Sequence, residues 1–188
     1  MKRIKRRIAR RRRKVLSPEI KTYLKKTDRF RAGREPMGLM RLAPAKFARA
    51  VAGLSSATLH RRPAPGKWCI QEILGHLVDT EVVYGYRIRM ANMQSGSPIQ
   101  AYDQAQWVRD ANYRGRKWSA KKLLGQIADL RRATLYYLDN MPRGTAKKRF
   151  GMHSERGRET VRRTQELIAG HDLNHLDQIR AIRKKFGR

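Results

Sequence analysis

Two histidines near the C-terminus have the spacing of metal ligands. His171 and His175 stand four residues apart in the segment AGHDLNHLDQI (residues 169–179), between the apolar residues Ile168 and Ile179. On a helix, side chains four residues apart point in the same direction, so both imidazoles would face the interior of the fold. A buried imidazole without hydrogen-bond partners costs about 1–3 kcal/mol. A pair of them on an apolar stripe therefore needs a chemical explanation.

A third histidine, His76, has a similar inward position in an earlier helical segment, between Ile73 and Thr80. Imidazole is a good ligand for Zn, Ni, Cu and Fe, and two histidines four residues apart offer two nitrogens from one rigid element. Three protein ligands leave at least one coordination position open, as in catalytic metal sites. The spacing therefore indicates a metal site made of His76, His171 and His175. The alternative, three core histidines bonded to neighbouring Asp or Asn side chains, stays open at this point.

Residues 171–175 also read H-D-x-x-H, which is close to the H-E-x-x-H motif of zinc proteases, with Asp172 in the place of the base. Aspartate is one methylene shorter than glutamate. Only 13 residues follow His175, and Asp177 is the sole acid or histidine among them. A protease of this type usually takes its third ligand from downstream, so the sequence does not favour it.

The elements that must position these histidines are helices. Apolar residues recur at helical spacing in four segments, whereas the alternation typical of strands is nearly absent, so we expect no sheet. Segments rich in proline and glycine, such as RRPAPGK and NMPRG, separate the helices. Pro44 suits a first helical turn, and Ser119 suits an N-cap. The expected helices cover residues 42–54, 68–92, 119–138 and 160–185.

Four amphipathic helices of this length predict an all-α fold, a four-helix bundle occupying residues 37–188. The connection between the second and third helices, residues 94–117, is unusually long for a compact domain. A connection of this length can carry the chain from one end of the bundle to the other. The second and third helices would then be parallel.

The charge of the chain is strongly positive and unevenly distributed. The formal net charge is +30, and residues 1–36 hold 16 Lys or Arg against 3 Asp or Glu. We expect residues 1–36 to be a flexible basic extension, since the unbroken run from Arg10 to Lys14 repels itself unless an anion binds it. The positive field of such a chain favours the binding of polyanions such as nucleic acid. Nucleic-acid binding through the basic tail is possible but not favoured, because no known nucleic-acid motif appears.

The single cysteine, Cys69, excludes an intramolecular disulfide and fits a reducing cytosol. No apolar run approaches the roughly 18 residues of a membrane span. The basic start MKRIKRRIARRRRK is not followed by the apolar stretch of a signal peptide. We therefore expect a cytoplasmic protein without a membrane partner. The place of Cys69 near the start of the second helix suggests a lowered pKa, although no histidine pairs with it as in a cysteine-nucleophile enzyme.

Several stretches together resemble the DinB-like superfamily of metal-dependent bundle proteins. They are PAPGKWCIQEILGHLVDTEVVYGYRIR, AYDQAQW, LRRATLYYL, GMHSERGRETVR and LIAGHDLNHLDQIRAIR, which cover roughly residues 38–185. The resemblance implies a four-helix bundle with up-down-down-up topology. It also implies a three-histidine site for Zn, Ni or Mn, with the ligands falling on His76, His171 and His175. Two departures are Cys69, where relatives often have serine, and the basic tail.

The resemblance further implies an enzyme that acts on a small-molecule substrate, and often a homodimer. Some members of the family are thiol S-transferases that use bacillithiol or mycothiol, and others are named hydrolases. Our first expectation is a metal-dependent transferase that joins a low-molecular-weight thiol to an electrophile. The alternatives are a metal-dependent hydrolase and a basic nucleic-acid-binding bundle without catalysis.

Two further residues are candidates for roles at this site. Asp79, one turn after His76, is expected to orient a ligand imidazole or to accept a proton. A pairing of Asp79 with Arg87, or with another side chain on the helix surface, is the structural alternative. Arg87 is the candidate for binding an anionic group of a thiol cofactor. Asn174, beside the histidine pair, is a weaker candidate for orienting a ligand.

Overall fold

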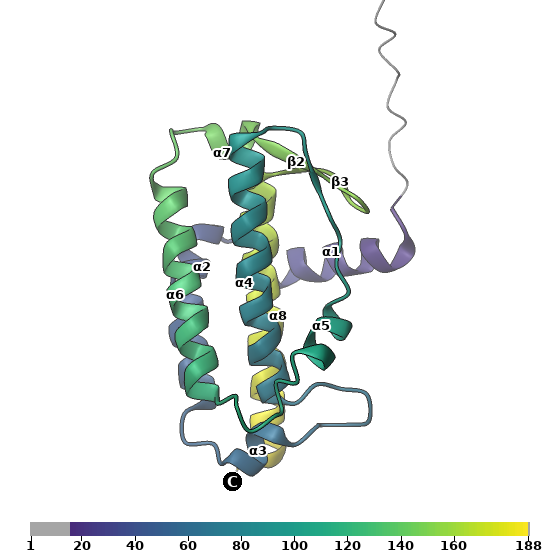
Figure 1. Ribbon diagram of the computed structural model, residues 1–188, viewed down its shortest axis with the longest axis vertical. Helices are drawn as coiled ribbons and strands as arrows, with labels where there is room; N and C mark the ends of the chain where they lie inside the picture. Colours follow the sequence, from purple (N-terminus) through teal and green to yellow (C-terminus); the bar gives the residue numbers. More distant parts are fainter. Residues whose placement is uncertain (1–15, 188) are drawn as a thin grey trace, which may run out of the picture.

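The computed structural model describes residues 16–187, which are mainly helical. The four long helices α2, α4, α6 and α8 form a bundle, in which α2 and α4 each pack against both α6 and α8 (Figure 1). In chain order the elements are α1 (Pro18–Arg31), α2 (Pro36–Val51), α3 (Ser56–His60), α4 (Ile70–Met93), β1 (Ser97–Ile99), α5 (Gln104–Asp110), α6 (Ala120–Asp139), α7 (Thr145–Lys148), β2 (Phe150–His153), β3 (Gly157–Thr160) and α8 (Val161–Phe186).

The long connection runs along the outside of the bundle. In Figure 1 it leaves the upper end of α4, passes through β1 and descends to α5 beside the lower half of α4. It then turns beside the lower end of the bundle and enters α6 there. As a result α4 and α6 run in one direction, while α2 and α8 run in the other. The three histidines therefore come from antiparallel neighbours, α4 and α8.

The helix starts follow from capping residues in the sequence. Ser119 accepts a hydrogen bond from the backbone N–H of Lys122 (3.3 Å), as its predicted N-cap role requires. The Thr160 hydroxyl accepts from the N–H of Arg163 (3.0 Å) at the start of α8. The Glu72 carboxylate accepts from the N–H of Cys69 (2.9 Å), which fixes the first turn of α4.

The first bundle helix starts earlier than the sequence prediction. It begins at Pro36, where the Glu35 carboxylate caps it by accepting from the N–H of Gly38 (2.7 Å). Pro44 therefore lies inside the helix instead of in its first turn, and it supplies no backbone N–H donor there. Both Pro36 and Pro44 are residues that suit the first turn of a helix. The prediction chose Pro44 because the helical spacing of apolar residues is clear only after it.

The prediction that the chain contains no sheet is wrong. β1 pairs in parallel with β2, and β2 pairs with β3 in an antiparallel hairpin. Each strand has only three or four residues, so the alternation that reveals a strand has no length in which to appear. Gly157 in the hairpin has φ 76°, a conformation that suits glycine. The sheet covers the end of the bundle at which α8 starts (Figure 1).

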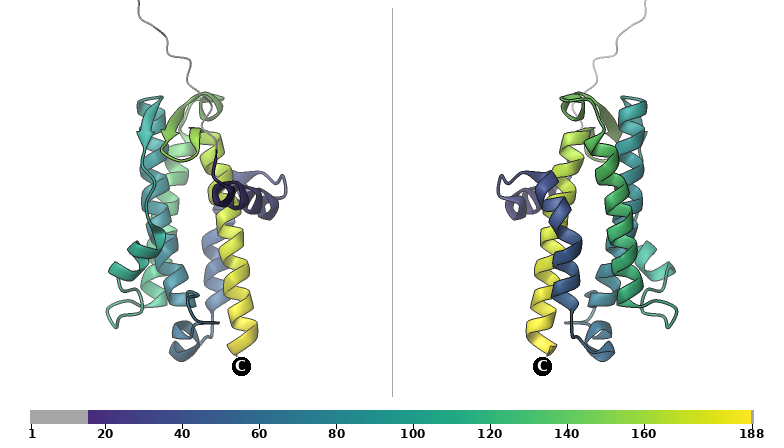
Figure 2. Two further views of the ribbon diagram at one scale, coloured as in Figure 1. Left: turned by 90° about the vertical axis from the view of Figure 1, so that its right-hand side faces the viewer. Right: turned by 90° about the vertical axis from the view of Figure 1, so that its left-hand side faces the viewer.

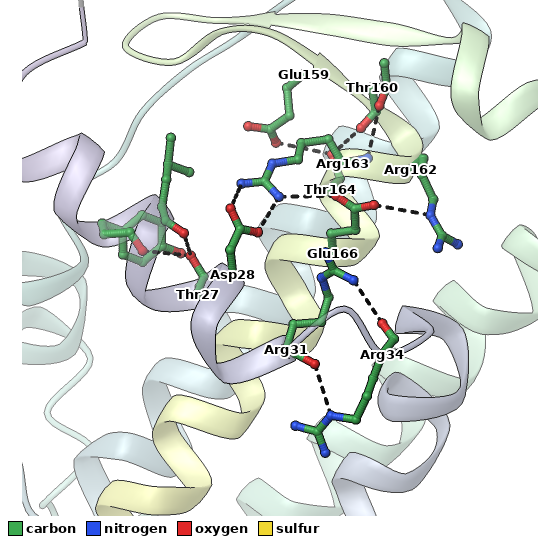
Figure 3. Close-up of polar contacts among 12 residues, drawn as sticks. Thr27, Asp28, Arg31, Arg34, Glu159, Thr160, Arg162, Arg163, Thr164 and Glu166 are labelled. Atoms are coloured by element: carbon green, nitrogen blue, oxygen red, sulfur yellow. Dashed lines mark hydrogen bonds and ion pairs between the residues drawn. The ribbon is translucent and has the colours of Figure 1, made fainter.

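Residues 18–31, which lie within the expected basic extension, form the helix α1. This helix lies across α8 (Figure 2). Its buried residue Thr27 packs against Gly170, where an added Cβ would overlap the Thr27 carbonyl oxygen. The Arg163 guanidinium donates to both carboxylate oxygens of Asp28, at 2.6 and 2.9 Å (Figure 3).

The signal for α1 is local and was hidden by the surrounding charge. Ser17 caps the helix by accepting from the N–H of Ile20 (3.3 Å), and Pro18 stands in the first turn. The basic run from Arg10 to Lys14 lies outside the described residues. Within residues 16–187, no helix is both long enough and apolar enough to cross a membrane.

Candidate metal centre

Three imidazoles from two helices converge inside the bundle. Nε2 of His171 lies 3.0 Å from Nε2 of His76 and 3.1 Å from Nε2 of His175. All three side chains are buried, with exposed fractions of 0 to 6%. Their ligand atoms lie within 4.8 Å of one another, and this is the one such group of three or more potential ligands among residues 16–187. The predicted convergence of His76, His171 and His175 is thus present.

The surroundings keep these imidazoles neutral, which is the form that binds metals. Burial lowers the pKa of His76 and of His171 well below the ordinary histidine value, and the neighbouring imidazoles lower it further. Burial lowers the pKa of His175 to about 4. At neutral pH each ring therefore has one lone pair available for coordination.

The donor set fits a divalent metal ion. Around a tetrahedral ion with bonds of 2.0–2.1 Å, two nitrogen ligands are about 3.3 Å apart, close to the two distances observed. Three Nε2 atoms that face one point cannot all be satisfied by hydrogen bonds among themselves, because a neutral ring has only one N–H. A cation at that point satisfies all three lone pairs.

The Nδ1 atoms of the three rings, which point away from the cluster, differ in their hydrogen bonds. Nδ1 of His175 hydrogen-bonds Oε1 of Gln178 at 3.1 Å, which directs Nε2 toward the cluster. Nδ1 of His76 and Nδ1 of His171 have no hydrogen-bond partner among residues 16–187. The Trp68 ring packs against the cluster instead, with its centroid 4.9 Å from that of His76 and 6.4 Å from that of His175.

Asp79 lies one turn after His76 and is paired with a tyrosine. The Tyr113 hydroxyl donates to its carboxylate at 2.6 Å, and the ring of Tyr113 lies close over Gly75. Burial raises the pKa of Asp79 above its ordinary value, although the tyrosine hydrogen bond acts in the opposite direction. Asn174 is half-buried beside the histidine pair.

Arg87 lies on the same helix as His76 but farther along it. Eleven residues separate the two, which corresponds to about 16 Å along the helix axis. Its guanidinium donates to the backbone carbonyl of Gln100 and lies near the rings of Tyr84 and Tyr102. The structure therefore places Arg87 in the contact between α4 and the long connection.

The remaining histidines and the cysteine lie outside the cluster. His153 is buried in β2, where its Nδ1 accepts from the backbone N–H groups of Glu155 and Arg156 (3.1 and 3.3 Å). His60 bonds the backbone carbonyl of Ser56 in α3. Burial raises the pKa of Cys69 to about 11, so the expectation of a lowered pKa is wrong.

Sequence reasoning missed a buried ion-pair network beside the histidines. Arg131 of α6, with an exposed side-chain fraction of 1%, pairs with Glu81 of α4 and with Asp172 of α8. It also donates to the backbone carbonyl of Met40 in α2 at 2.8 Å, so that one side chain contacts all four bundle helices. Asp172 is thus engaged by an arginine. The available signal was an arginine on the inner face of a predicted helix.

Comparison with known proteins places this geometry in a family. The model of the DinB superfamily matches residues 39–179, a segment that includes all three clustered histidines. A "Putative metal-dependent hydrolase" from Geobacillus thermodenitrificans is 23% identical over 154 residues, which cover 82% of this chain and 85% of that protein. A similarly named protein from Bacillus mycoides is 22% identical over 143 residues, covering 76% of this chain and 80% of that protein.

A solved structure shares the fold. YfiT from Bacillus subtilis, described as "a probable metal-dependent hydrolase with an unusual four-helix bundle topology", superposes with a TM-score of 0.74 at 18% sequence identity. The superposition covers 94% of this chain and 93% of YfiT. Since the family model matches most of the chain, this protein belongs to the DinB superfamily.

Proposed function

We propose that this protein is a metal-dependent hydrolase in which His76, His171 and His175 hold a divalent Zn, Ni or Mn ion. The observation that carries the proposal is the convergence of three buried, neutral Nε2 atoms from α4 and α8. Two curated relatives that cover most of the chain carry the name of metal-dependent hydrolases. We take the bundle to have the up-down-down-up order of the family, supported by the helix directions in Figure 1.

A divalent ion bound there would act as a Lewis acid that activates a water molecule or a thiol. In this proposal Asp79 is the group that takes up and returns the proton. Burial raises the pKa of this carboxylate above its ordinary value, which makes it a stronger proton acceptor. The Tyr113 hydroxyl holds that carboxylate by donating to one of its oxygens, which leaves the other oxygen for the proton.

Arg87 has a narrower role in this proposal than the sequence suggested. Because it lies about 16 Å along α4 from His76, it can meet only the far end of an extended substrate. Its contact with Gln100 also occupies part of the guanidinium.

Thiol transfer is the competing chemistry, with a low-molecular-weight thiol as co-substrate. Cys69 is buried and its pKa is raised to about 11, so the chain itself offers no thiolate at neutral pH. A transferase would have to take its thiol from solution. Hydrolysis is preferred because the names of the curated relatives specify it.

One experiment separates the two chemistries. The metal-loaded protein is incubated with a panel of esters, amides and phosphoesters, and in parallel with monochlorobimane plus glutathione, cysteine, bacillithiol or mycothiol. Metal-dependent hydrolysis that is lost in His171→Ala and retained in His60→Ala supports the proposal. Conjugation of a thiol to bimane without any hydrolysis would replace it with thiol transfer.

The sequence-based proposals on partners can be tested separately. A homodimer and a cytoplasmic location are proposed on the family resemblance and on the composition of the chain. Nucleic-acid binding by the basic tail is the alternative without catalysis. It requires an affinity for DNA or RNA that falls steeply with salt and that is lost when residues 1–15 are removed.

A further inference from the structure

A pocket approaches the histidine cluster from the end of the bundle at which α8 finishes. It has a volume of about 490 Å³, and it is formed by the loop between α3 and α4, the start of α4 and the last turns of α8. Its apolar wall includes Trp68, Ile73 and Ile182, and its polar lining includes His175 and Gln178. A pocket of this size and lining is typical of a small-molecule site.

Trp68 connects this pocket to the candidate metal centre. Its ring is part of the pocket wall and also packs against the imidazoles of His76 and His175. His175 itself lines the pocket. A molecule that lies against Trp68 in this pocket is therefore beside two of the three clustered histidines.

The mouth of the pocket is cationic. Lys67 and Lys185 both line the pocket and are exposed, and no acidic side chain lines it. The Lys185 ammonium donates to the Pro63 carbonyl at 2.9 Å, which ties the loop to α8 and leaves two N–H donors. An anion at this mouth would meet two ammonium groups, one from the loop and one from the end of α8.

The surface around the mouth of the pocket is also positively charged. The loop and the helix end that line the pocket are residues 61–67 and 180–185. They contain three and four Lys or Arg respectively, and no Asp or Glu. Charges gathered around a concave opening raise the local concentration of anions and their rate of entry.

We propose that the substrate of this protein is a small molecule with an apolar, ring-containing body and an anionic group. The body lies along Trp68, Ile73 and Ile182, while the anion stays at the mouth between Lys67 and Lys185. This inference rests on the proposed hydrolytic function of the histidine cluster. It specifies which molecules reach the cluster, which the donor set alone does not.

A matched pair of fluorescent probes tests the inference without turnover. The probes are 1-anilinonaphthalene-8-sulfonate and N-phenyl-1-naphthylamine, which share one ring system and differ in the sulfonate. Both become fluorescent on entering an apolar site, and a sulfonate is a poor metal ligand. On the full chain in low salt we expect the sulfonate probe to bind at least about fivefold more tightly than the neutral probe. Raising the salt to about 0.5 M should remove most of that advantage.

Two charge-removing variants locate the effect. Lys67→Met and Lys185→Gln, the latter keeping a donor for Pro63, should each weaken sulfonate binding about threefold, as expected for one charge at 6–8 Å in a watery mouth. Neither should change binding of the neutral probe. Lys121→Met and Lys122→Met remove the same charge from the exposed start of α6 at the same end of the bundle, and they should leave both affinities unchanged.

The inference fails if the two probes bind equally, or if the variants of α6 weaken sulfonate binding as much as those at the mouth. It also fails if Ile73→Trp, which fills the pocket, leaves binding of both probes intact. These outcomes are independent of the proposed hydrolysis, which is judged by turnover and by metal content. A protein that turns over only neutral substrates would keep the proposed function and refute this inference.

Discussion

Arg131 of α6 and Asp172 of α8 form a buried ion pair, with Nη1 2.9 Å from Oδ2, and Asp172 directly follows His171 in the chain. The same guanidinium binds Glu81 of α4, where Nε lies 3.0 and 3.1 Å from the two carboxylate oxygens. One guanidinium thus pairs with two buried carboxylates and joins the two helices that carry the histidines.

Replacing this arginine should destabilise the bundle severely. Arg131→Met leaves Glu81 and Asp172 buried without their shared partner, a change that typically costs 3–5 kcal/mol. We expect a loss of about that size in the free energy of unfolding measured with urea. The next residue provides the control, because Arg132 pairs with Asp129 on the exposed surface. Arg132→Met should cost less than about 1 kcal/mol, and equal losses would show that the buried network has no special role.

Acid should destabilise the metal-free protein through its buried histidines. The folded-state pKa values of His76, His171 and His175 lie below the ordinary value of 6.5. Below about pH 6.5 these histidines therefore bind protons in the unfolded chain but stay neutral in the folded chain. The free energy of unfolding falls as the pH falls. For His175 this loss continues down to about pH 4.

The loss amounts to about 1.4 kcal/mol per pH unit for each such histidine. Urea unfolding between pH 7 and pH 5 in the presence of a chelator measures it. The free energy of unfolding of His175→Gln should depend less steeply on pH than that of the native chain. The difference in slope should correspond to close to one proton taken up on unfolding. If the two dependences have the same slope, His175 does not titrate as a buried neutral imidazole.

The docking of α1 on α8 depends on a glycine. In Gly170→Ala the new methyl group would overlap the backbone carbonyl of Thr27, which cannot move without the helix. We expect α1, which is rich in lysine and arginine, to detach and to be cut by trypsin several-fold faster within residues 18–31.

Gly125→Ala is the matched control for that experiment. Gly125 is exposed in α6 with nothing within 4 Å of an added Cβ. Alanine there should leave the trypsin pattern unchanged and, through its helix propensity, stabilise the protein by up to about 1 kcal/mol. If cleavage within α1 is equally slow in both variants, the contact of Thr27 with Gly170 does not hold α1 in place.

The histidine cluster was predictable because helical periodicity places residues on faces. The spacing of four between His171 and His175, and the apolar neighbours of all three histidines, fixed which side of each helix they occupy. Periodicity also gave α4, α6 and α8 nearly to their ends, whereas α2 begins earlier than predicted, at Pro36. These features depend on residues close together in the chain, where a single sequence carries most of its information.

Contacts between distant segments were not predictable in the same way. The pairing of Arg131 with Glu81 and Asp172 joins three helices, and no local pattern specifies which buried charges meet. The short strands have too few residues to show alternation. The helix at residues 18–31 depends on Gly170, about 140 positions later, for a place to dock. The start signal of Ser17 and Pro18 is present in the sequence, but it does not show where the helix docks.

The metal content of the purified, untagged protein shows whether the three clustered histidines hold an ion. We expect about one equivalent of Zn, Ni or Mn per chain by elemental analysis, and none in His76→Ala, His171→Ala or His175→Ala. His60→Ala and His153→Ala should keep the metal, because neither ring belongs to the cluster. Retention of a full equivalent in the three cluster variants would contradict the assignment of these histidines as the ligands.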